Sequence, residues 1–481
     1  MAKLVIDVPD ELKGVVAAML ESLESLKATL ATTEGGRSLD YSGVEEEVAE
    51  KAAAIERASH QSILQGLDID VPTVIIGGVR YNRVGRCEDK YHTMVGSVSV
   101  ERSLYRASGQ RGGQPGGKVV DAVSLRAGVV GDGWLPRTAR AMAHELQKGT
   151  SREAALSAAE TLRLPYSRCS FERVAHVVGA LSVAGHRDVE DVLIEAYEMP
   201  AEAVTLAVSL DRVSVPMEEP RRRPVGRPRK NAPKKPVERN FRMAYCGTVS
   251  IHDEQGTTLH TIRYGCMPDG DVLAMRDRLA ADAAVLLTKK DGMRVQLLCD
   301  GAAEMWSLLE GAFTEERFGT PIHRLVDMPH LLEKLGAAAR EIEARGGPQA
   351  AGKLATWKLG LCNRNSAART ILEELESTGL DGGSSDCPVH AAITYLRHHA
   401  MDEDRMNYAR ARRLGLPLAS GNVEATCKCL FETRMKRCGS RWKPDTGQHI
   451  IHLRALALSD RWGPAVELTL RPLAKPVRAA A

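Results

Sequence analysis

The order of apolar segments in the middle of the chain constrains its fold more than any other feature. Short apolar or alternating runs are typical of strands, whereas apolar residues at a period near 3.6 are typical of helices. Three strands, a helix, a strand, a helix and a strand are predicted in this order. The strands cover residues 204–210, 243–251, 259–264, 295–299 and 322–326. The first helix ends at residue 287, and the second covers residues 302–313.

This order matches a ribonuclease H-like layout. Helical patterns follow over residues 331–344, 353–377 and 390–413, broken by a loop over residues 379–388, and they predict a helical insertion before a last helix at Glu424. The predicted fold class is α/β: a ribonuclease H-like catalytic core with a helical insertion, preceded by an α+β N-terminal region.

The N-terminal region begins with two amphipathic patterns over residues 9–30 and 42–67. Ser42 and Glu45 fit a capping box, in which two side chains satisfy free amides at the start of a helix. These patterns predict a helical hairpin. Its helices either pack within one chain or also form contacts between copies.

Alternation replaces the helical pattern between residues 71 and 106. Val98, Val100 and Leu104 are expected on one face, with polar residues interspersed, which favours a small antiparallel sheet. A glycine-rich stretch follows, and we place a domain boundary near Gly117.

Helices are predicted between residues 125 and 197, where Thr150 and Glu153 fit a second capping box. Residues 162–167 fit the turn before a helix over residues 170–181. A helix-turn-helix DNA reader has this form and presents polar side chains from its second helix. Plain helical packing explains the pattern equally well. The side chains that would serve are Arg168, Arg173 and His176.

Six regions follow from these patterns. They are residues 1–117, the helical hairpin and small sheet; 118–200, helical and a candidate for DNA binding; 201–330, the first part of the core, with a basic loop at 221–239; 331–418, the helical insertion; 419–465, the glutamate helix and the C-terminal part of the core; and 466–481, a tail.

Composition narrows the setting. The chain has 481 residues, a formal net charge of +3 and ten cysteines without a CxxC pair. Zinc modules and disulfide frameworks are therefore disfavoured, and reduced thiols are expected. No apolar run approaches the ~20 residues that span a bilayer. We expect a soluble, cytoplasmic protein with no membrane partner.

Three acidic residues stand where chemistry is often placed. Asp211 ends one predicted strand, Asp300 ends another, and Glu424 opens a helix after Ser-Gly-Asn. Carboxylates at such positions can converge on two divalent cations and support phosphodiester cleavage. Each also has a plainer explanation, because aspartate caps helices and forms turns and glutamate suits a helix N-terminus.

The strings around these acids resemble bacterial insertion-sequence transposases of the Kra group, which are distantly similar to Mutator-like transposases. The resemblance covers roughly residues 70–465 and is most convincing over residues 204–462. It rests on SLDRVSVPM (209–217), CDGA (299–302), DMPH (327–330), SGNVEATCK (420–428), RMKRCGSRW (434–442) and IHLRAL (451–456).

The resemblance implies a DDE catalytic site made of Asp211, Asp300 and Glu424, which would hold two Mg²⁺ or Mn²⁺ ions. It also implies a role for Asp327 with His330, because related enzymes place an acid or cysteine three residues before a histidine near the scissile strand. His330 would donate to a phosphate oxygen or to the leaving group. Core packing or capping is the alternative for this histidine.

Several residues near Glu424 are candidates for DNA contact. For the lysine, the alternative to DNA contact is an ion pair with Glu424. For the basic cluster, it is a favourable interaction with a helix C-terminus. The tryptophan would either stack on a base or pack in the core. The candidates are Lys428, Arg434, Lys436, Arg437, Arg441 and Trp442.

The basic loop holds nine lysine or arginine residues against one acid over residues 221–239. It resembles an AT-hook, in which arginines around a Pro- and Gly-containing segment enter a narrow A·T-rich minor groove. A solvated loop tip is the alternative. The predicted DNA contacts are Arg221, Arg222, Arg223, Arg227, Arg229 and Lys230.

These observations predict a DDE transposase that cleaves DNA and transfers strands, with element ends and target DNA as partners. Joining two ends suggests a homo-oligomer. The alternatives are a non-catalytic DNA-binding protein derived from a transposase and a nuclease that cuts without joining.

Overall fold

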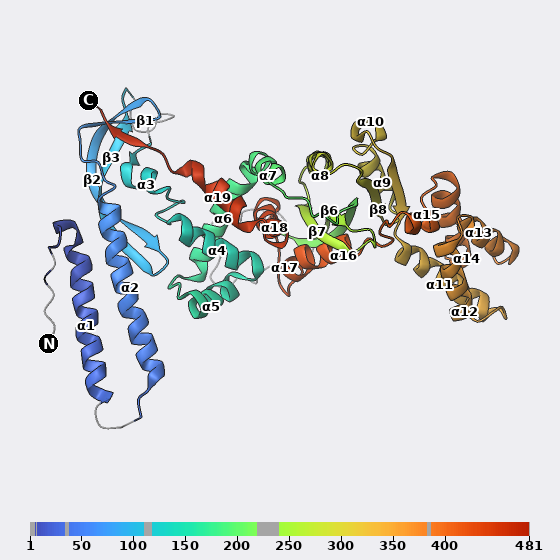
Figure 1. The fold of residues 1–481 in the computed structure, drawn as a ribbon, viewed down its shortest axis with the longest axis horizontal. Coiled ribbons are helices and arrows are strands. Elements are labelled where there is room, and N and C mark those ends of the chain that lie inside the picture. Colours follow the sequence, from blue (N-terminus) through green and yellow to red (C-terminus); the bar gives the residue numbers. More distant parts are fainter. Residues whose placement is uncertain are drawn as a thin grey trace, which may run out of the picture. The chain divides into compact units, whose positions relative to one another are not determined.

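The computed structural model describes residue 5 and residues 7–33, 38–109, 118–218, 240–381 and 386–480. The fold is mixed α/β and contains two five-stranded sheets. The chain divides into two compact units, each described by itself (Figure 1). Unit 1 comprises Met1–His186 and Gly463–Ala481, and unit 2 comprises Arg187–Trp462. Among the described helices, none combines the length and apolarity needed to cross a bilayer.

Unit 1 begins with the predicted helical hairpin. After a 3₁₀ turn, α1 (Lys13–Thr33) runs beside α2 (Tyr41–Gln65), as Figure 1 shows. The predicted capping box of Ser42 and Glu45 is wrong. The N-cap is Asp40, whose carboxylate accepts a hydrogen bond from the Gly43 amide, so the cap lies two residues earlier than predicted and Ser42 lies inside the first turn.

The predicted antiparallel sheet is present and has the strand order β10-β1-β2-β3-β4. Val98 and Val100 are buried as expected, but Leu104 is only half-buried, and Ser103 and Tyr105 are buried instead. The first half of β3 packs one face against α2, and the second half packs its other face against β1 and β10. The strands are β1 (Thr73–Ile76), β2 (Val79–Thr93), β3 (Gly96–Ala107), β4 (Val120–Asp121) and β10 (Val477–Ala479).

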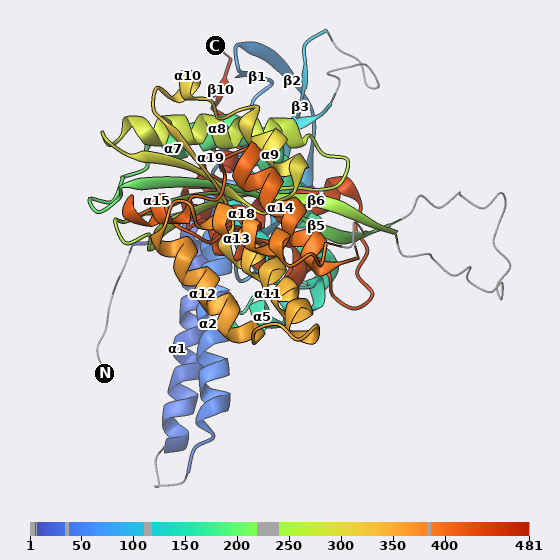
Figure 2. The same cartoon turned by 90° about the vertical axis from the view of Figure 1, so that its right-hand side faces the viewer.

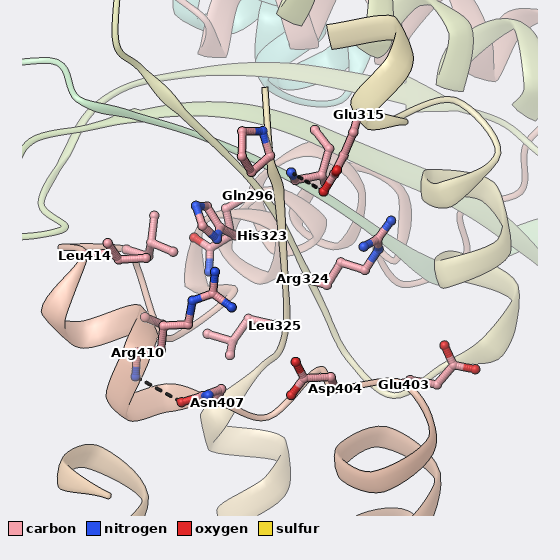
Figure 3. A pocket seen from close by; sticks show the side chains of 14 residues that line it. Gln296, Glu315, His323, Arg324, Leu325, Glu403, Asp404, Asn407, Arg410 and Leu414 are labelled. Carbon is pink, nitrogen blue, oxygen red and sulfur yellow. Dashed lines mark hydrogen bonds between the residues drawn. The ribbon is translucent and has the colours of Figure 1, made fainter. Parts of the chain in front are cut away.

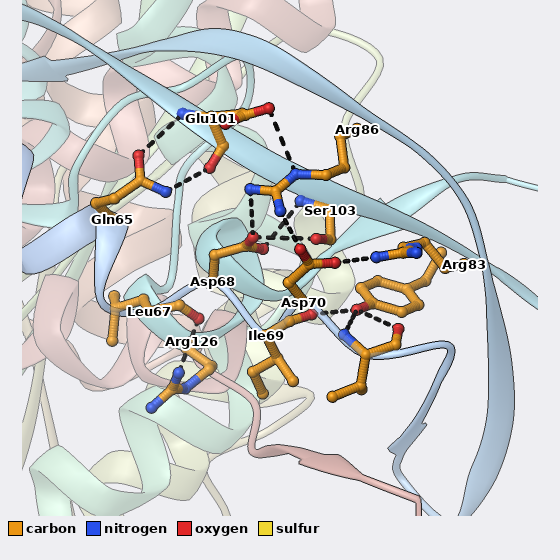
Figure 4. Close-up of polar contacts among 12 residues, drawn as sticks. Gln65, Leu67, Asp68, Ile69, Asp70, Arg83, Arg86, Glu101, Ser103 and Arg126 are labelled. Carbon is orange, nitrogen blue, oxygen red and sulfur yellow. Dashed lines mark hydrogen bonds and ion pairs between the residues drawn. The ribbon is translucent and has the colours of Figure 1, made fainter.

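Polar contacts fix the end of α2 to β3 (Figure 4). Gln65 exchanges two hydrogen bonds with the backbone of Glu101, at 2.9 and 3.1 Å. Asp68 accepts from both the amide and the hydroxyl of Ser103, at 2.9 and 3.0 Å, and lies 3.5 Å from the Arg86 guanidinium. The hairpin is therefore anchored to the sheet at one end.

The remaining helices of unit 1 include the predicted helix-turn-helix segment. Thr150 and Glu153 form the capping box predicted from the sequence. The predicted tail, residues 466–481, contains the end of α19 and the whole of β10, which pairs with β1. The predicted boundary at Gly117 lies outside the described residues. These helices are α3 (Ala122–Ala127), α4 (Pro136–Lys148), α5 (Ser151–Leu162), α6 (Arg168–Ala184) and α19 (Trp462–Leu470).

Unit 2 is built on a mixed sheet of order β7-β6-β5-β8-β9. The first three strands in sequence pair antiparallel, and β8 and β9 are then added parallel to β5. Every strand predicted for this segment is present, although β5 continues well past Asp211. The strands are β5 (Thr205–Met217), β6 (Asn240–His252), β7 (Thr258–Cys266), β8 (Arg294–Cys299) and β9 (Ile322–Val326).

Helices cover both faces of this sheet (Figure 2). On one face Leu210 packs in the same cluster as Leu279 of α8 (Val272–Thr288). On the other face Val213 packs in the same cluster as Phe431. The helices of the first part of unit 2 are α7 (His186–Glu195), α8, α9 (Ala303–Glu310) and α10 (Glu315–Phe318).

The predicted helical insertion follows β9. Its second predicted helix, over residues 353–377, is two helices separated at residues 364–366, and its third contains a π-helical turn, Arg397–Asp402. The elements are α11 (Met328–Ala344), α12 (Ala350–Asn363), α13 (Ala367–Ser377), α14 (Pro388–Leu396) and α15 (Tyr408–Arg413), then α16 (Gly421–Thr426), the π-helical segment Cys427–Glu432, α17 (Thr433–Met435) and α18 (Pro444–Leu458).

Candidate active site

Two adjacent parallel strands place the first two acids. Asp300 directly follows β8, as predicted, whereas Asp211 lies in the middle of β5 rather than at its end. The strand continues because residues after Asp211 keep pairing with β6, from Asp211 opposite Cys246 to Met217 opposite Asn240. Asp211 is therefore held in the interior of a paired strand, with strand residues both before and after it.

Strand alternation sets the direction of Asp211. It shares its parity with Val213, Val215 and Met217, which pack toward the π-helical segment after α16. From that segment the Cys427 thiol donates to Asp211 Oδ2 over 3.4 Å. A hydrogen bond with Cys246 and, after it, burial raise the pKa of the Cys427 thiol, which keeps it a neutral donor.

The third acid lies on α16, which begins at Gly421, inside the Ser-Gly-Asn string rather than after it as predicted. Glu424 stands in the first turn, and its side chain is 39% exposed. The start of this helix is fixed by Asp327, whose Oδ1 accepts a hydrogen bond from the Ser420 amide. The end of β9 and the start of the glutamate helix are thus joined by one buried carboxylate.

Asp327 and His330 form the pair suggested by the sequence. Asp327 caps α11, is fully buried, and accepts through Oδ2 from the amide of His330 at 3.1 Å and from its Nδ1 at 2.6 Å. Burial alone would raise the pKa of this carboxyl. The hydrogen bonds from His330 and Ser420 outweigh burial and lower it.

His330 is the point at which the acidic residues meet. Its Nδ1 lies 3.8 Å from Glu424 Oε1. The hydrogen bond to Asp327 is the largest cause that raises its pKa to about 9, and the charges of Asp327, Asp300 and Glu424 add to it. The imidazole is therefore protonated at neutral pH, with acidic side chains from three elements around it.

Burial and a neighbouring charge act on Asp211. Burial raises its pKa first, and the negative charge of Asp300 raises it further, against the Arg212 amide, the Cys427 thiol and the charge of His330. The charge of Asp300 thus acts on the Asp211 carboxyl. A bound cation would relieve this repulsion.

Two sets of residues are candidates for holding such a cation. Within the described part of the chain, Asp327, His330 and Glu424 form a group whose ligand atoms all lie within 4.8 Å of one another. Both oxygens of Asp327 already accept hydrogen bonds, and the imidazole is protonated and donates to Asp327. Without a cation this group is an ion-pair network, and a cation bound here would have to displace the imidazole proton.

Asp211, Asp300 and Glu424 are the second set, and in the described part of the chain their ligand atoms do not all lie within 4.8 Å of one another. Among the described residues, Asp300 Oδ1 accepts the nearby Ala302 amide at 2.9 Å, and Asp211 Oδ2 accepts the weak thiol donor Cys427, while Asp211 Oδ1 accepts the Arg212 amide at 2.6 Å. Glu424 turns toward His330. Carboxylate oxygens that are partly exposed and weakly engaged are the donors that Mg²⁺ and Mn²⁺ prefer.

A further acid, Glu304, is already engaged. It lies on the first turn of α9 and accepts from Arg212 at 2.6 Å and from the Tyr245 hydroxyl at 2.5 Å. Both partners come from β5 and β6. Glu304 therefore joins the helix to the sheet beside the site, which favours a structural role for it.

Tyr395 of α14 is a neighbour of the site that sequence reasoning missed. A Cβ on Gly301 would lie 2.6 Å from its hydroxyl, so Gly301 gives the ring room beside Asp300. Burial raises the pKa of Tyr395, and the charges of Asp300 and Asp327 add to the effect. The Lys334 ammonium lies 4.8 Å from the ring centroid. The insertion thus contributes to the site, and no local sequence signal indicated it.

Cys427 was also missed, although a signal was present. It follows Glu424 by three residues, a spacing that places side chains on one helical face. Its neighbour Lys428 is exposed, and the described residues record no ion pair between Lys428 and Glu424.

The other predicted DNA contacts near this helix divide into two groups. Arg434 is buried, and its guanidinium lies 4.8 Å above the ring of Trp442. Trp442 donates from its indole to the Met435 carbonyl and bridges to Met217 through its backbone, so packing explains both residues. Lys436 and Arg441 are exposed, and Lys436 pairs with Glu432 of its own helix at 2.7 Å.

Arg437 is half-buried and donates to the Thr433 carbonyl. Arg221, Arg222, Arg223, Arg227, Arg229 and Lys230 lie outside the described residues.

A cavity of about 230 Å³ lies elsewhere in unit 2, between β9 and α15 (Figure 3). Figure 3 shows His323, Arg410 and Gln296 close together on one side of it. None of the three acids Asp211, Asp300 and Glu424 lines this cavity. The cavity is separate from the acidic cluster.

Comparisons with known proteins give no assignment. No protein-family model matches the chain, and no curated protein matches it.

Proposed function

We propose that the chain is a DDE transposase with a ribonuclease H-like core, which cleaves DNA strands and transfers them in the presence of a divalent cation. The strand order β7-β6-β5-β8-β9, with three antiparallel strands followed by two parallel ones, supports the ribonuclease H-like assignment. The resemblance of the strings around the acids supports the transposase assignment.

One observation carries the proposal. Carboxylates from the middle of β5, from the end of β8 and from the first turn of α16 act on one another or on one protonated histidine, although they are far apart in sequence. Acids at such positions would also cap helices or form turns, but those roles do not require them to gather. Convergence of this kind is what metal-dependent phosphodiester chemistry needs.

The cations would be two Mg²⁺ or Mn²⁺ ions held by Asp211, Asp300 and Glu424. When bound, they would activate the attacking oxygen and stabilise the leaving oxygen of an in-line displacement. Asp327 keeps His330 in place and protonated, since both of its oxygens are engaged. His330 would then donate its Nε2 proton toward a phosphate oxygen or the leaving 3′-oxygen.

DNA would be held by basic residues around this site. Lys428 lies in the π-helical segment directly after the helix that carries Glu424, and Arg441 follows α17; both are exposed, and their charges would contact a phosphate chain. The basic segment 221–239 joins β5 to β6 and would hold DNA close to the strand that carries Asp211. Element ends and target DNA are the proposed partners, and a cytoplasmic location is part of the proposal.

Two alternatives remain open to test. A transposase-derived protein that only binds DNA would leave the acids unused, and the gathered carboxylates argue against it. A ribonuclease H-like nuclease would use the same acids but would not join the cut end to a target.

A plasmid that carries the native locus and its flanks tests all three. The purified protein is incubated with this plasmid and a target plasmid in Mg²⁺ and in Mn²⁺, and breaks and junctions are sequenced. We expect cuts at paired ends and strand-transfer junctions. Asp211→Asn and Glu424→Gln should lose both, while Glu432→Gln, at a half-buried glutamate of the following segment, should keep both.

Each alternative has its own result in this assay. Binding without cuts, for the wild type and the variants alike, would favour the DNA-binding protein. Cuts without junctions would favour the nuclease. Cuts that persist in pure Asp211→Asn protein would overturn the assignment of this residue.

A further inference from the structure

Helix α1 of unit 1 carries a row of exposed apolar side chains. We call Met19, Leu20, Leu23, Leu26 and Leu30 the leucine stripe; they are 46–60% exposed. Scattered exposed leucines are ordinary in folded proteins. A contiguous row on one helix is not ordinary and marks an interaction surface.

The hairpin partner of α1 uses a different face. Apart from Val16, the half-buried residues of α1 recur at steps of three and four residues, and the Ser25 hydroxyl donates to Glu47 of α2. These residues are small or short: Val15, Ala18, Ser22, Ser25 and Thr29. The larger side chains of the helix are therefore not the ones that hold the hairpin together.

The leucine stripe repeats the same steps one residue later. Met19, Leu23, Leu26 and Leu30 are separated by four, three and four residues. One residue is about 100° around an α-helix, so the stripe points about a quarter of a turn away from α2. Apolar residues at alternating steps of three and four form the seam by which one helix packs on another.

We propose that the leucine stripe is a self-association surface that binds the α1 helix of a second copy of this chain. A surface that joins two identical chains around a two-fold axis must be complementary to itself, and a row of leucines at heptad spacing meets this condition. Each copy would also bring its own α2, which gives a four-helix arrangement at the interface.

The area of the stripe is sufficient for a specific dimer. With on the order of 100 Å² accessible on each of its five side chains, two copies would remove about 1,000 Å² from water, where specific interfaces begin. The association is therefore expected to be modest in strength and reversible.

Charge argues against two other occupants. The charged residues of α1 are Lys13, Glu21, Glu24 and Lys27, which balance. A helix that binds an anionic membrane surface is rich in lysine and arginine on its polar face, and a helix that binds nucleic acid also carries excess positive charge. Another helix of balanced charge is the partner that fits.

Mass measurement on the full-length protein tests the proposal. Light scattering after size-exclusion chromatography at ~10 µM should give about twice the chain mass of 52.3 kDa for the wild type. Leu23→Glu, at the centre of the stripe, should give the mass of a single chain. Ala28→Glu places the same charge on the opposite side of α1 and should remain a dimer.

The outcomes separate clearly. Equal circular dichroism and melting of the three proteins would show that Leu23→Glu acts on association, because this side chain is 60% exposed. If that variant unfolds, Leu26→Lys replaces it. A monomeric wild type would overturn the proposal, and so would a Leu23→Glu protein that remains dimeric. Binding of anionic vesicles by a monomeric wild type would assign the stripe to a membrane instead. None of these results depends on DNA cleavage, so failure here is distinguishable from failure of the proposed function.

Discussion

Replacing Asp327 by asparagine tests how the site is held in place. Asp327 is fully buried and accepts three hydrogen bonds, from the Ser420 amide and from the amide and Nδ1 of His330. Asparagine keeps the shape but removes the charge, and its NH₂ group must face a donor. A buried donor left without an acceptor costs about 1–3 kcal/mol.

The magnitude follows from the pKa of His330. If that pKa falls from about 9 to 6.5, the interaction between Asp327 and His330 loses about 3 kcal/mol, at about 1.36 kcal/mol for each pH unit by which the pKa falls. The His330 side chain is 39% exposed, so solvent screening reduces this part to about 1–2 kcal/mol. Together with the unmatched donor, we expect a loss of about 3 kcal/mol in local stability.

Two assays read this effect. In Asp327→Asn, the titration of His330, followed by NMR of labelled histidine, should move toward 6.5. Hydrogen exchange of the starts of α11 and α16 should accelerate by about 100-fold. Asp277→Asn, at a surface ion pair with Arg276, should change neither. An unchanged His330 pKa together with unchanged exchange would refute the role given to Asp327.

Three further predictions follow from particular residues. Gly301→Ala should lower stability by about 1–3 kcal/mol in urea unfolding and reduce cleavage, because the new Cβ would meet the Tyr395 ring at 2.3 Å. Gly352→Ala is the control, because it adds a Cβ to open space in α12 and should be neutral or stabilising. Equal effects of the two substitutions would contradict the prediction. Deleting residues 221–235 removes eight basic residues and should flatten the dependence of log K on log salt for DNA binding by about 0.9 per lost phosphate contact; an unchanged slope would exclude this segment as a DNA contact. The raised pKa of His330 stabilises the metal-free fold fully below about pH 6.5, and this stabilisation is lost as the pH rises to 9. Hydrogen exchange at the start of α11, corrected for its intrinsic pH dependence, should therefore become faster between pH 6.5 and 9. Slower exchange over this range would contradict the prediction.

The elements of unit 2 were predictable because each carries a strong local signal. Residues 322–326 form β9 within the predicted bounds, and Asp300 ends β8 as expected. The full length of β5 was not predictable from the sequence, because Pro216 suggests that the strand ends before it. Proline is tolerated there because β8 pairs only as far as Val208, which leaves that edge of the strand without a ladder partner in β8.

Features that depend on distant partners escaped prediction. Strand β10 has three residues and is stable only through β1, at the other end of the chain. Tyr395 approaches Asp300 because α14 folds back on the core, which no pattern around either residue reveals. The candidate acids were chosen from family strings, but the engagement of both Asp327 oxygens was visible only in the fold.

Binding of Mn²⁺, followed by electron paramagnetic resonance in the presence of end DNA, tests the central claim most directly. The account places the cation on Asp211, Asp300 and Glu424 and keeps His330 as a proton donor. Binding should therefore be lost in Asp211→Asn and Asp300→Asn and retained in His330→Gln. Binding that survives in both aspartate variants but is lost in His330→Gln would place the cation on the Asp327, His330 and Glu424 group and contradict the account.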